Sequence, residues 1–127
     1  MINQEYILNQ QVIVNQQLQE EIQYEQLEFP VIRFIDQMDY FADNSFLCHW
    51  HTEFELAVVL QGSVEYWLDQ NIFHISAGDG IFINSQILHS AHQLTSGSVI
   101  FNILFPPTLL TPSVHLLCTR NILALFP

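Results

Sequence analysis

The sequence predicts an all-β fold, in which short strands form a single sandwich or barrel. Between residues 29 and 105, runs of β-branched and aromatic residues alternate with turn-forming residues about every 8 to 12 positions. The same region shows no long helical period, and the chain shows no clear internal repeat. The chain has 127 residues, half of them hydrophobic, which suits one domain with a packed core.

The expected strands follow one another through this region and are separated by polar or glycine-containing turns. Residues 46–62 provide one or two strands that end at Gly62. A polar loop at 36–45 precedes them, and the short turns at 77–80 and 95–97 contain glycine. The remaining expected strands occupy residues 29–35, 63–69, 72–76, 81–85, 87–94 and 98–105.

Residues 1–28 are rich in Gln, Asn and Glu and differ in character from the strands that follow. Leu8, Val12, Leu18 and Ile22 recur at roughly helical spacing, which indicates an amphipathic helix over part of the segment. A run of β-branched residues in the middle of the segment opposes a helix. The segment is therefore expected to be either an N-terminal helix or a polar arm.

Residues 106–127 interrupt the strand pattern with prolines and end in an apolar stretch that carries little charge. Such a stretch would leave an apolar patch if it were free surface. We therefore expect this C-terminal segment to continue into a further domain or to dock on a partner subunit. The predicted organisation is an arm or helix (1–28), a barrel (29–105) and this C-terminal segment (106–127).

The charge balance opposes direct binding to nucleic acid. The chain has no lysine, its only arginines are Arg33 and Arg120, and its formal net charge is −11. Because Lys and Arg supply most of the affinity for phosphates, such a chain repels DNA, RNA and anionic membranes. The sequence shows no secretory signal, no apolar run of membrane-spanning length, and only two cysteines, Cys48 and Cys118. These features predict a cytoplasmic protein with reduced cysteines.

The stretch HWHTEFELAVVLQG, which ends at Gly62, places two histidines and a glutamate close together. His49, His51 and Glu55 share strand parity, so on one continuous strand they would point to the same side. Glu53 also shares this parity and competes for the same role, whereas a turn or bulge before Glu55 would break it. Imidazole and carboxylate groups suit a transition metal, but they also line organic-ligand sites or occur as satisfied core residues. All three interpretations remain open on these residues alone.

A second group of polar residues lies in the stretch GDGIFINSQILHSAHQ, which begins at Gly78. Gly78 marks a turn, and His89 is a candidate third imidazole for the same interior, with His92 as the alternate. His74 is expected to have a structural or surface role, and His115 carries no functional indication.

These two stretches resemble the two sequence motifs of the cupin superfamily. The first motif is matched in spacing at four positions, which are His49, His51, Glu55 and Gly62. The second motif is matched by Gly78 and His89. Asp43 stands where the first motif begins with glycine. In the second motif, Asn84, Gln86 and Gln93 stand in place of the proline, the second glycine and the asparagine. The resemblance covers about residues 29–105 and implies a double-stranded β-helix, or jelly-roll, barrel, while the degenerate second motif is less typical of cupin enzymes.

Within that superfamily the chain is most similar to the N-terminal sensor domains of AraC-type transcription regulators. The similarity lies in HWHTEFELAVVLQGSVEYWLD and GDGIFINSQILHSA. It implies a homodimeric domain that binds a small effector, such as a sugar. DNA would be bound only through C-terminal helix-turn-helix units that this chain lacks, which explains its acidic charge, and no membrane partner is expected.

The resemblance and the residues leave two functions. A sensor would bind its effector inside the barrel with apolar strands and a few polar or aromatic side chains. The candidates for this role are His49, His51, Glu55, His89, Tyr66 and Trp67. A small metal-dependent enzyme of oxygenase or isomerase type would instead hold a divalent transition metal. The positions that match the metal ligands of cupins are His49, His51, Glu55 and His89. We predict the sensor, with no catalytic residue and no required cofactor, and keep the enzyme as the alternative.

Overall fold

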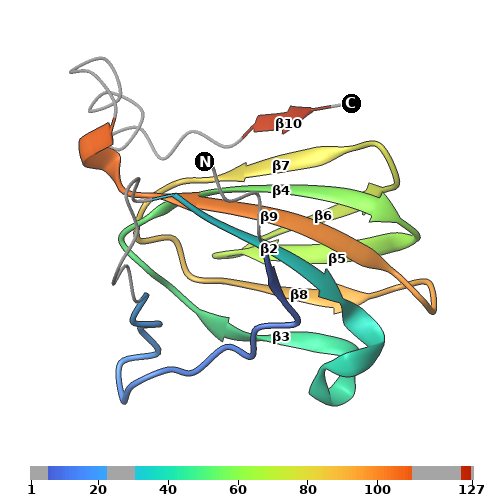
Figure 1. Cartoon of the computed structure of the whole chain (residues 1–127), viewed down its shortest axis with the longest axis horizontal. Helices are drawn as coiled ribbons and strands as arrows, with labels where there is room; N and C mark the ends of the chain where they lie inside the picture. Colours follow the sequence, from blue (N-terminus) through green and yellow to red (C-terminus); the bar gives the residue numbers. More distant parts are fainter. Residues whose placement is uncertain (1–5, 23–30, 110–123, 127) are drawn as a thin grey trace.

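In a computed structural model, strands form two facing sheets, and the expectation of an all-β jelly-roll barrel is confirmed (Figure 1). The structure describes residues 6–22, 31–109 and 124–126. Across these ranges the regular structure consists of strands and three short 3-10 helices, η1 (Met38–Tyr40), η2 (Ala42–Asn44) and η3 (Pro107–Leu109). None of the helices in the described part of the chain is long and apolar enough to cross a membrane.

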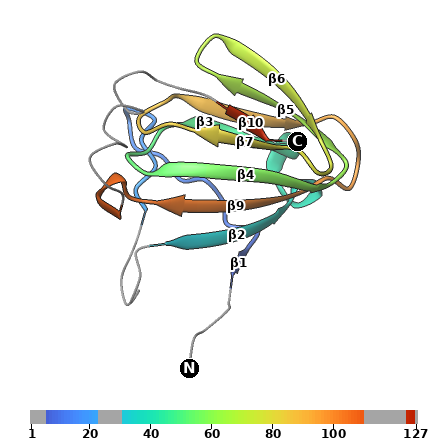
Figure 2. The same ribbon diagram turned by 90° about the horizontal axis from the view of Figure 1, so that it is seen from above.

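The larger sheet has six strands and the smaller sheet has four. The order in the larger sheet is β1 (Ile7–Leu8), β2 (Ile32–Gln37), β9 (Val99–Phe105), β4 (Phe54–Gln61), β7 (Gly80–Ile83) and β10 (Ala124–Phe126). The order in the smaller sheet is β3 (Ser45–His49), β8 (His89–Gln93), β5 (Ser63–Leu68) and β6 (Asn71–Ser76). Figure 2 shows β2, β9 and β4 side by side in the larger sheet.

Alternating side chains from both sheets fill the space between them. Along β9 and β5, every second residue is buried, as expected for strands with one face on a core. The buried apolar side chains include Val59, Val64, Tyr66, Ile81 and Ile100. The same alternation also turns several polar residues inward, and these residues form the candidate site.

The long apolar segment before Gly62 forms two strands that lie in different sheets. β3 ends at His49 in the smaller sheet, β4 begins at Phe54 in the larger sheet, and residues 50–53 connect them. β4 then turns into β5 at Gly62, which has a φ of +81°. A Cβ atom at this position would collide with the side chain of Ser98, so both the backbone conformation and the close approach require glycine.

Residues 6–22 form an extended arm, so the alternative of an N-terminal helix is wrong for this part of the chain. β1 pairs in parallel with β2, and the Asn9 side chain holds this pairing through hydrogen bonds of 2.7 and 2.9 Å with Gln37. Further along, Asn15 Oδ1 accepts hydrogen bonds from two of the backbone N–H groups that follow it. This local side-chain bonding stabilises a turn in place of a helix, and the β-branched run before it favours extended backbone.

The barrel strands β2 to β9 occupy residues 32–105, inside the predicted range of 29–105. The division into arm, barrel and C-terminal segment itself stays a prediction. Of the C-terminal segment, the structure describes η3 and β10, and β10 pairs antiparallel with β7. His115 and Cys118 lie outside the described residues.

Candidate functional site

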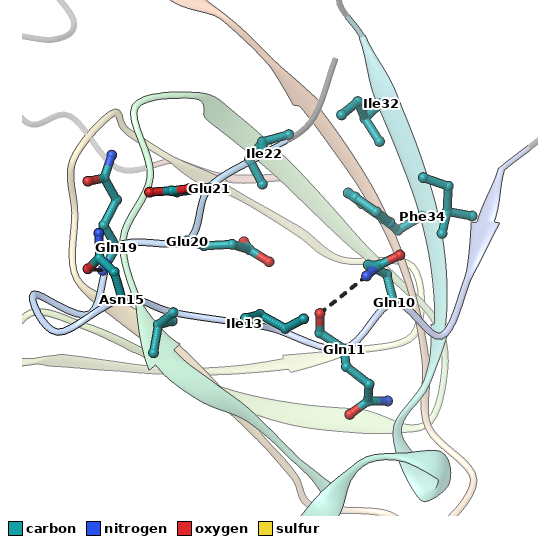
Figure 3. Close-up of a pocket in the computed structure, with 12 residues that line it drawn as sticks. Gln10, Gln11, Ile13, Asn15, Gln19, Glu20, Glu21, Ile22, Ile32 and Phe34 are labelled. Carbon is teal, nitrogen blue, oxygen red and sulfur yellow. Dashed lines mark hydrogen bonds between the residues drawn. The ribbon is translucent and has the colours of Figure 1, made fainter. Parts of the chain in front are cut away.

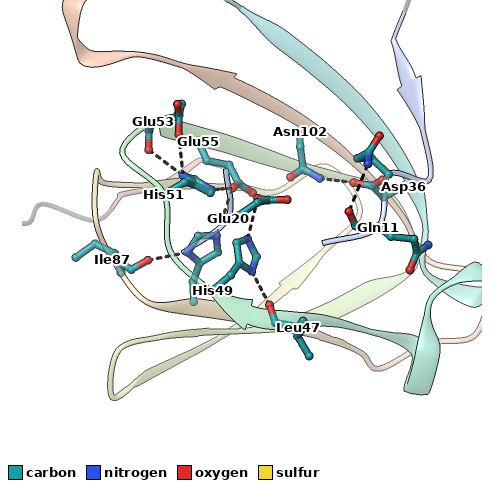
Figure 4. Close-up of polar contacts among 12 residues, drawn as sticks. Gln11, Glu20, Asp36, Leu47, His49, His51, Glu53, Glu55, Ile87 and Asn102 are labelled. Atoms are coloured by element: carbon teal, nitrogen blue, oxygen red, sulfur yellow. Dashed lines mark hydrogen bonds and ion pairs between the residues drawn. The ribbon is translucent and has the colours of Figure 1, made fainter. Parts of the chain in front are cut away.

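Four of the predicted side chains meet inside the barrel. His49, His51, Glu55 and His89 are all buried, and their candidate ligand atoms lie within 4.8 Å of one another (Figure 4). They do not share one continuous strand, because they come from the end of β3, the 50–53 connection, β4 and the start of β8. The parity argument therefore does not explain their convergence, which results from the chain crossing between the two sheets.

Each imidazole of this histidine cluster is oriented by its own stretch of backbone. In all three histidines Nδ1 bonds to the carbonyl oxygen of a residue two positions away in the sequence (Figure 4). These carbonyls belong to Leu47, Glu53 and Ile87, in the order of the histidines. Because a carbonyl only accepts hydrogen bonds, Nδ1 carries the proton in each ring, and Nε2 of a neutral ring presents its lone pair to the centre.

The Glu55 carboxylate lies among these Nε2 atoms. Glu55 Oε1 is 3.1 Å from Nε2 of His51 and 3.4 Å from Nε2 of His89. The approach to His89 lacks hydrogen-bond geometry, and Nε2 of His89 is buried without a partner among the described residues. With all rings neutral, lone pairs of nitrogen and oxygen would face one another, so the cluster requires a proton or a metal ion at its centre.

A proton on His51 supplies this positive charge in the absence of metal. Burial opposes the charged imidazole, but the hydrogen bond and charge of Glu55 outweigh it and raise the pKa of His51. Burial also opposes the carboxylate, yet the hydrogen bond from His51 and the close approach of the His89 imidazole hold the pKa of Glu55 below its usual range. Burial and the nearby His89 lower the pKa of His49 to about 3, which keeps this ring neutral.

The histidine cluster fits a transition metal ion. Metal–ligand bonds of about 2.1 Å at ordinary angles separate neighbouring ligand atoms by roughly 3–3.5 Å. The distances of 3.1 and 3.4 Å around Glu55 lie in this range. Imidazoles whose Nδ1–H is held by a backbone carbonyl are typical of metal ligands, and three nitrogens with one carboxylate suit Zn, Fe, Mn or Ni. A bound metal would supply Lewis-acid chemistry, and His49, His51, Glu55 and His89 would hold it.

The arm adds a carboxylate that sequence reasoning missed. Glu20 Oε1 lies 3.6 Å from Nε2 of His49, and burial raises the pKa of Glu20 to about 7. Backbone hydrogen bonds of Trp50 with Leu18 and Glu20, at 3.0 and 2.8 Å, dock the arm beside the two motif histidines. Nothing in the sequence marks Glu20, because the contact depends on how the arm crosses the barrel.

The two aromatic candidates on β5 face opposite ways. Tyr66 is fully buried in the core, and its hydroxyl has no hydrogen-bond partner among the described residues. Trp67 is 43% exposed, and its Nε1 donates a hydrogen bond of 2.7 Å to Glu65. The expectation that Trp67 contributes to the interior is wrong, because adjacent strand residues point to opposite faces and Tyr66 occupies the inner one.

Of the remaining polar candidates, His92 and His74 lie apart from the histidine cluster, and Glu53 contacts only His51 within it. Nδ1 of His92, the alternate to His89, is 3.0 Å from Ser45 Oγ, and His74 is exposed with Nε2 2.7 Å from Glu65 Oε2. Glu53 contributes its backbone carbonyl to His51, while its carboxylate stays 3.9 Å from the ring. The site is therefore built from four residues of the two motifs and from Glu20 of the arm.

A second polar pair lies deeper along the larger sheet. Asn102 Nδ2 on β9 donates a hydrogen bond of 2.8 Å to Asp36 Oδ2 on β2 (Figure 4). In Figure 4, the carboxylates of Glu20 and Glu55 lie between this pair and the histidine cluster. Burial raises the pKa of Asp36 to about 7, and the hydrogen bond from Asn102 offsets this only in part. The sequence analysis did not identify either residue.

Two adjoining cavities lie next to the histidine cluster and the Asp36–Asn102 pair. A small inner cavity of about 40 Å³ is lined by both polar groups, with Glu20, Asp36, His49, Glu55 and Asn102 on its wall. A groove of about 470 Å³ runs under the arm against β2 (Figure 3). The two share Gln10, Glu20 and Phe34 as lining residues, so they lie directly next to each other.

Comparison with solved structures identifies the class of fold. The chain is similar to an RmlC-like cupin from Shewanella frigidimarina, with a TM-score of 0.54 and 19% identity over 61% of this chain and 67% of that one. It is also similar to protein YlbA from E. coli, with a TM-score of 0.53 and 21% identity over 64% of this chain and 32% of that one. These similarities show that the chain has a cupin-type barrel fold, and they show nothing about its function.

Comparison of the sequence identifies the family. The AraC-like ligand binding domain profile matches residues 32–117, and the chain belongs to this family. The chain is also 28% identical over 76 residues to the uncharacterized HTH-type transcriptional regulator YdeC of Bacillus subtilis. The match covers 60% of this chain and 26% of that protein, so the chain spans about a quarter of the length of this curated relative.

Proposed function

We propose that the chain is the sensor domain of an AraC-type transcription regulator and binds a small effector inside the barrel. Membership of the ligand-binding family and the similarity to a helix-turn-helix regulator support this function. The observation that carries it is the inner cavity, in which charged and amide side chains converge beside an apolar groove. Such a combination is typical of small-molecule sites.

In this proposal the domain is a cytoplasmic dimer. The effector acts by changing how the arm is held against the barrel. The arm supplies Glu20 and Gln10 to both cavities, so an occupant changes the contacts that hold the arm. Exposed apolar side chains at paired positions of β5 and β6, Trp67 and Ile72, support self-association. DNA would be contacted by a separate basic region, since the acidic barrel repels phosphates.

Two experiments test this function. The coding sequence downstream of codon 127 should encode a basic segment with two helix-turn-helix patterns, and a stop codon at that point would count against the regulator. A thermal-shift screen of small molecules should then identify an effector of the wild-type domain. His51→Ala and His89→Ala should lower its affinity with little loss of folding, and unchanged affinity in both variants would remove the histidine cluster from the effector site.

A metal-dependent enzyme is the second candidate, and the gathering of three imidazoles and Glu55, with Nε2 of His51 and of His89 close to the carboxylate, favours it. Elemental analysis of protein purified without chelator separates the two functions. The sensor should contain metal below one equivalent per chain. One tightly held transition metal per chain would favour the enzyme.

A further inference from the structure

Asp36 and Asn102 leave two buried acceptors without donors. The residues are only 5% and 4% exposed, and one hydrogen bond of 2.8 Å joins Asn102 Nδ2 to Asp36 Oδ2. The other oxygen of each side chain, Oδ1 in both cases, is buried with no hydrogen-bond partner among the described residues. Because buried polar atoms nearly always have a partner, two such oxygens on one pair point to a donor that the described part of the chain does not supply.

The surroundings of the pair do not suit a purely structural role. Asp36 and Asn102 occupy inward positions, and the neighbouring inward residues of β9 are the apolar Ile100 and Leu104. Asp36 accepts a hydrogen bond from Asn102, and the backbone N–H of Gln10 also lies close to it, but burial still dominates its pKa. A buried carboxyl group in this situation is costly unless a cation or further donors reach it. The pKa of Asp36, which burial raises to about 7, is consistent with a carboxylate that lacks such a partner.

The cavities next to the pair match a ligand with two unlike ends. The inner cavity of about 40 Å³ reaches Asp36 and Asn102 and has room for only a few atoms, since one water needs roughly 10–15 Å³. The adjoining groove of about 470 Å³ has an apolar lining that includes Ile13, Ile22 and Ile32 (Figure 3). A small polar head group therefore fits inside, with an apolar body in the groove.

The charge of the lining selects the sign of the head group. Four acidic side chains line the two cavities, which are Glu20, Glu21, Asp36 and Glu55. The lining residues in the described part of the chain include neither Lys nor Arg. A metal in the histidine cluster would bind Glu55, and the other three carboxyl groups would still be available to a ligand. An anionic head group would be repelled, whereas a cation would meet carboxylate and amide oxygens in a region of low dielectric.

We propose that Asp36 and Asn102 recognise the primary ammonium group of an amine effector, whose apolar body lies in the groove under the arm. This inference rests on the proposed function, because it takes the barrel interior as the effector site. An ammonium group has three donors, and two of them would satisfy Asp36 Oδ1 and Asn102 Oδ1. The third would face the carboxylates on the opposite wall of the cavity. A neutral sugar, the class that the family resemblance suggests, offers donors but no charge.

The test compares three probes of equal length, n-pentylamine, n-pentanol and n-pentanoate, with glucose as a fourth. Binding to the whole chain is measured by calorimetry and by the shift of the Asn102 side-chain amide in nitrogen-15 NMR spectra. Pentylamine should bind and move this resonance, while pentanoate should not. Asp36→Asn keeps the side-chain volume and should weaken pentylamine binding by roughly tenfold to a hundredfold, as expected for the loss of a charged hydrogen-bond partner.

The matched control is Asp69→Asn, the same chemical change in an exposed turn where Asn tolerates the positive φ of 52°. It should bind pentylamine like the wild type. Equal binding of the alcohol or the acid, binding of glucose in preference to the amine, unchanged binding in Asp36→Asn, or no amine binding would each overturn the inference. The head-group selectivity of the wild type decides the question even if Asp36→Asn does not fold. Failure of the sensor function would appear separately, in the sequence downstream of codon 127.

Discussion

The interior of the barrel holds two polar centres, the histidine cluster and the Asp36–Asn102 pair, which differ in how far their buried polar atoms are hydrogen-bonded. In the histidine cluster, backbone carbonyls fix every ring, and a hydrogen bond of 3.1 Å joins His51 to Glu55. One hydrogen bond joins Asp36 to Asn102, and within the described residues one oxygen of each side chain has no hydrogen-bond partner. The first centre is organised before anything binds, whereas the second becomes satisfied only when a donor arrives.

This difference separates two kinds of recognition. The histidine cluster offers nitrogen lone pairs, which bind a metal, a proton or a hydrogen-bond donor of an effector. The Asp36–Asn102 pair offers oxygen acceptors next to an apolar groove, which distinguish molecules by charge and by shape. Variants that affect one centre and leave the other intact therefore test the comparison directly.

The largest expected effect is on metal binding. His89→Ala should weaken the binding of added cobalt(II) by more than about a hundredfold, since changes to residues that merely support a metal ligand already cost about 10- to 100-fold. Visible absorbance of the bound ion measures this loss. Asp36→Asn should bind cobalt(II) like the wild type, and a comparable loss in both variants would show that the two centres act as one.

The next effect is on the pH dependence of stability. Burial raises the pKa of Asp36 to about 7, so the folded state retains a proton that the unfolded state releases above about pH 4. The contribution of Asp36 to the free energy of unfolding is largest below pH 4. It decreases as the pH rises toward 7, by at most about 1.4 kcal/mol per pH unit. Asp36→Asn should lower the slope of stability against pH in urea unfolding, and the part that remains is expected from Glu20, whose pKa burial also raises to about 7. An unchanged slope would contradict the assignment, and Asp69→Asn is the control.

The smallest effect is expected at Tyr66, which belongs to neither centre. Its buried hydroxyl has no partner among the described residues, so Tyr66→Phe should leave stability unchanged or raise it by up to about 1 kcal/mol. Cobalt(II) and pentylamine binding should not change. Urea unfolding measures the stability, and a clear loss would mean that the hydroxyl has a partner and that Tyr66 takes part in one of the centres.

The histidine cluster was predictable, and the Asp36–Asn102 pair was not. His49, His51, Glu55 and His89 are found because their spacing matches the two cupin motifs, although their meeting depends on the crossing of the chain between the sheets and on the pairing of β3 with β8. Asp36 and Asn102 meet only through the pairing of β2 with β9, between residues far apart in the sequence. Glu20 depends in the same way on the docking of the arm at Trp50.

The strands followed from β-branched and aromatic runs between turn residues, and the observed strands match their positions closely. The orientation of β5 did not follow, because adjacent Tyr66 and Trp67 are both plausible inward residues until the register is known. The N-terminal helix failed because its apolar spacing competes with β-branched residues and with the turn at Asn15. Local pattern thus determined element type, while packing determined which side chains meet.

The backbone carbonyls that hold the three imidazoles also affect how this protein can evolve. Leu47, Glu53 and Ile87 contribute main-chain oxygens, not side chains, to the histidines. Substitutions at these positions therefore alter the surface or the core without changing which ring nitrogen carries the proton. The side chains at these three positions can therefore vary while the orientation of the imidazoles is kept.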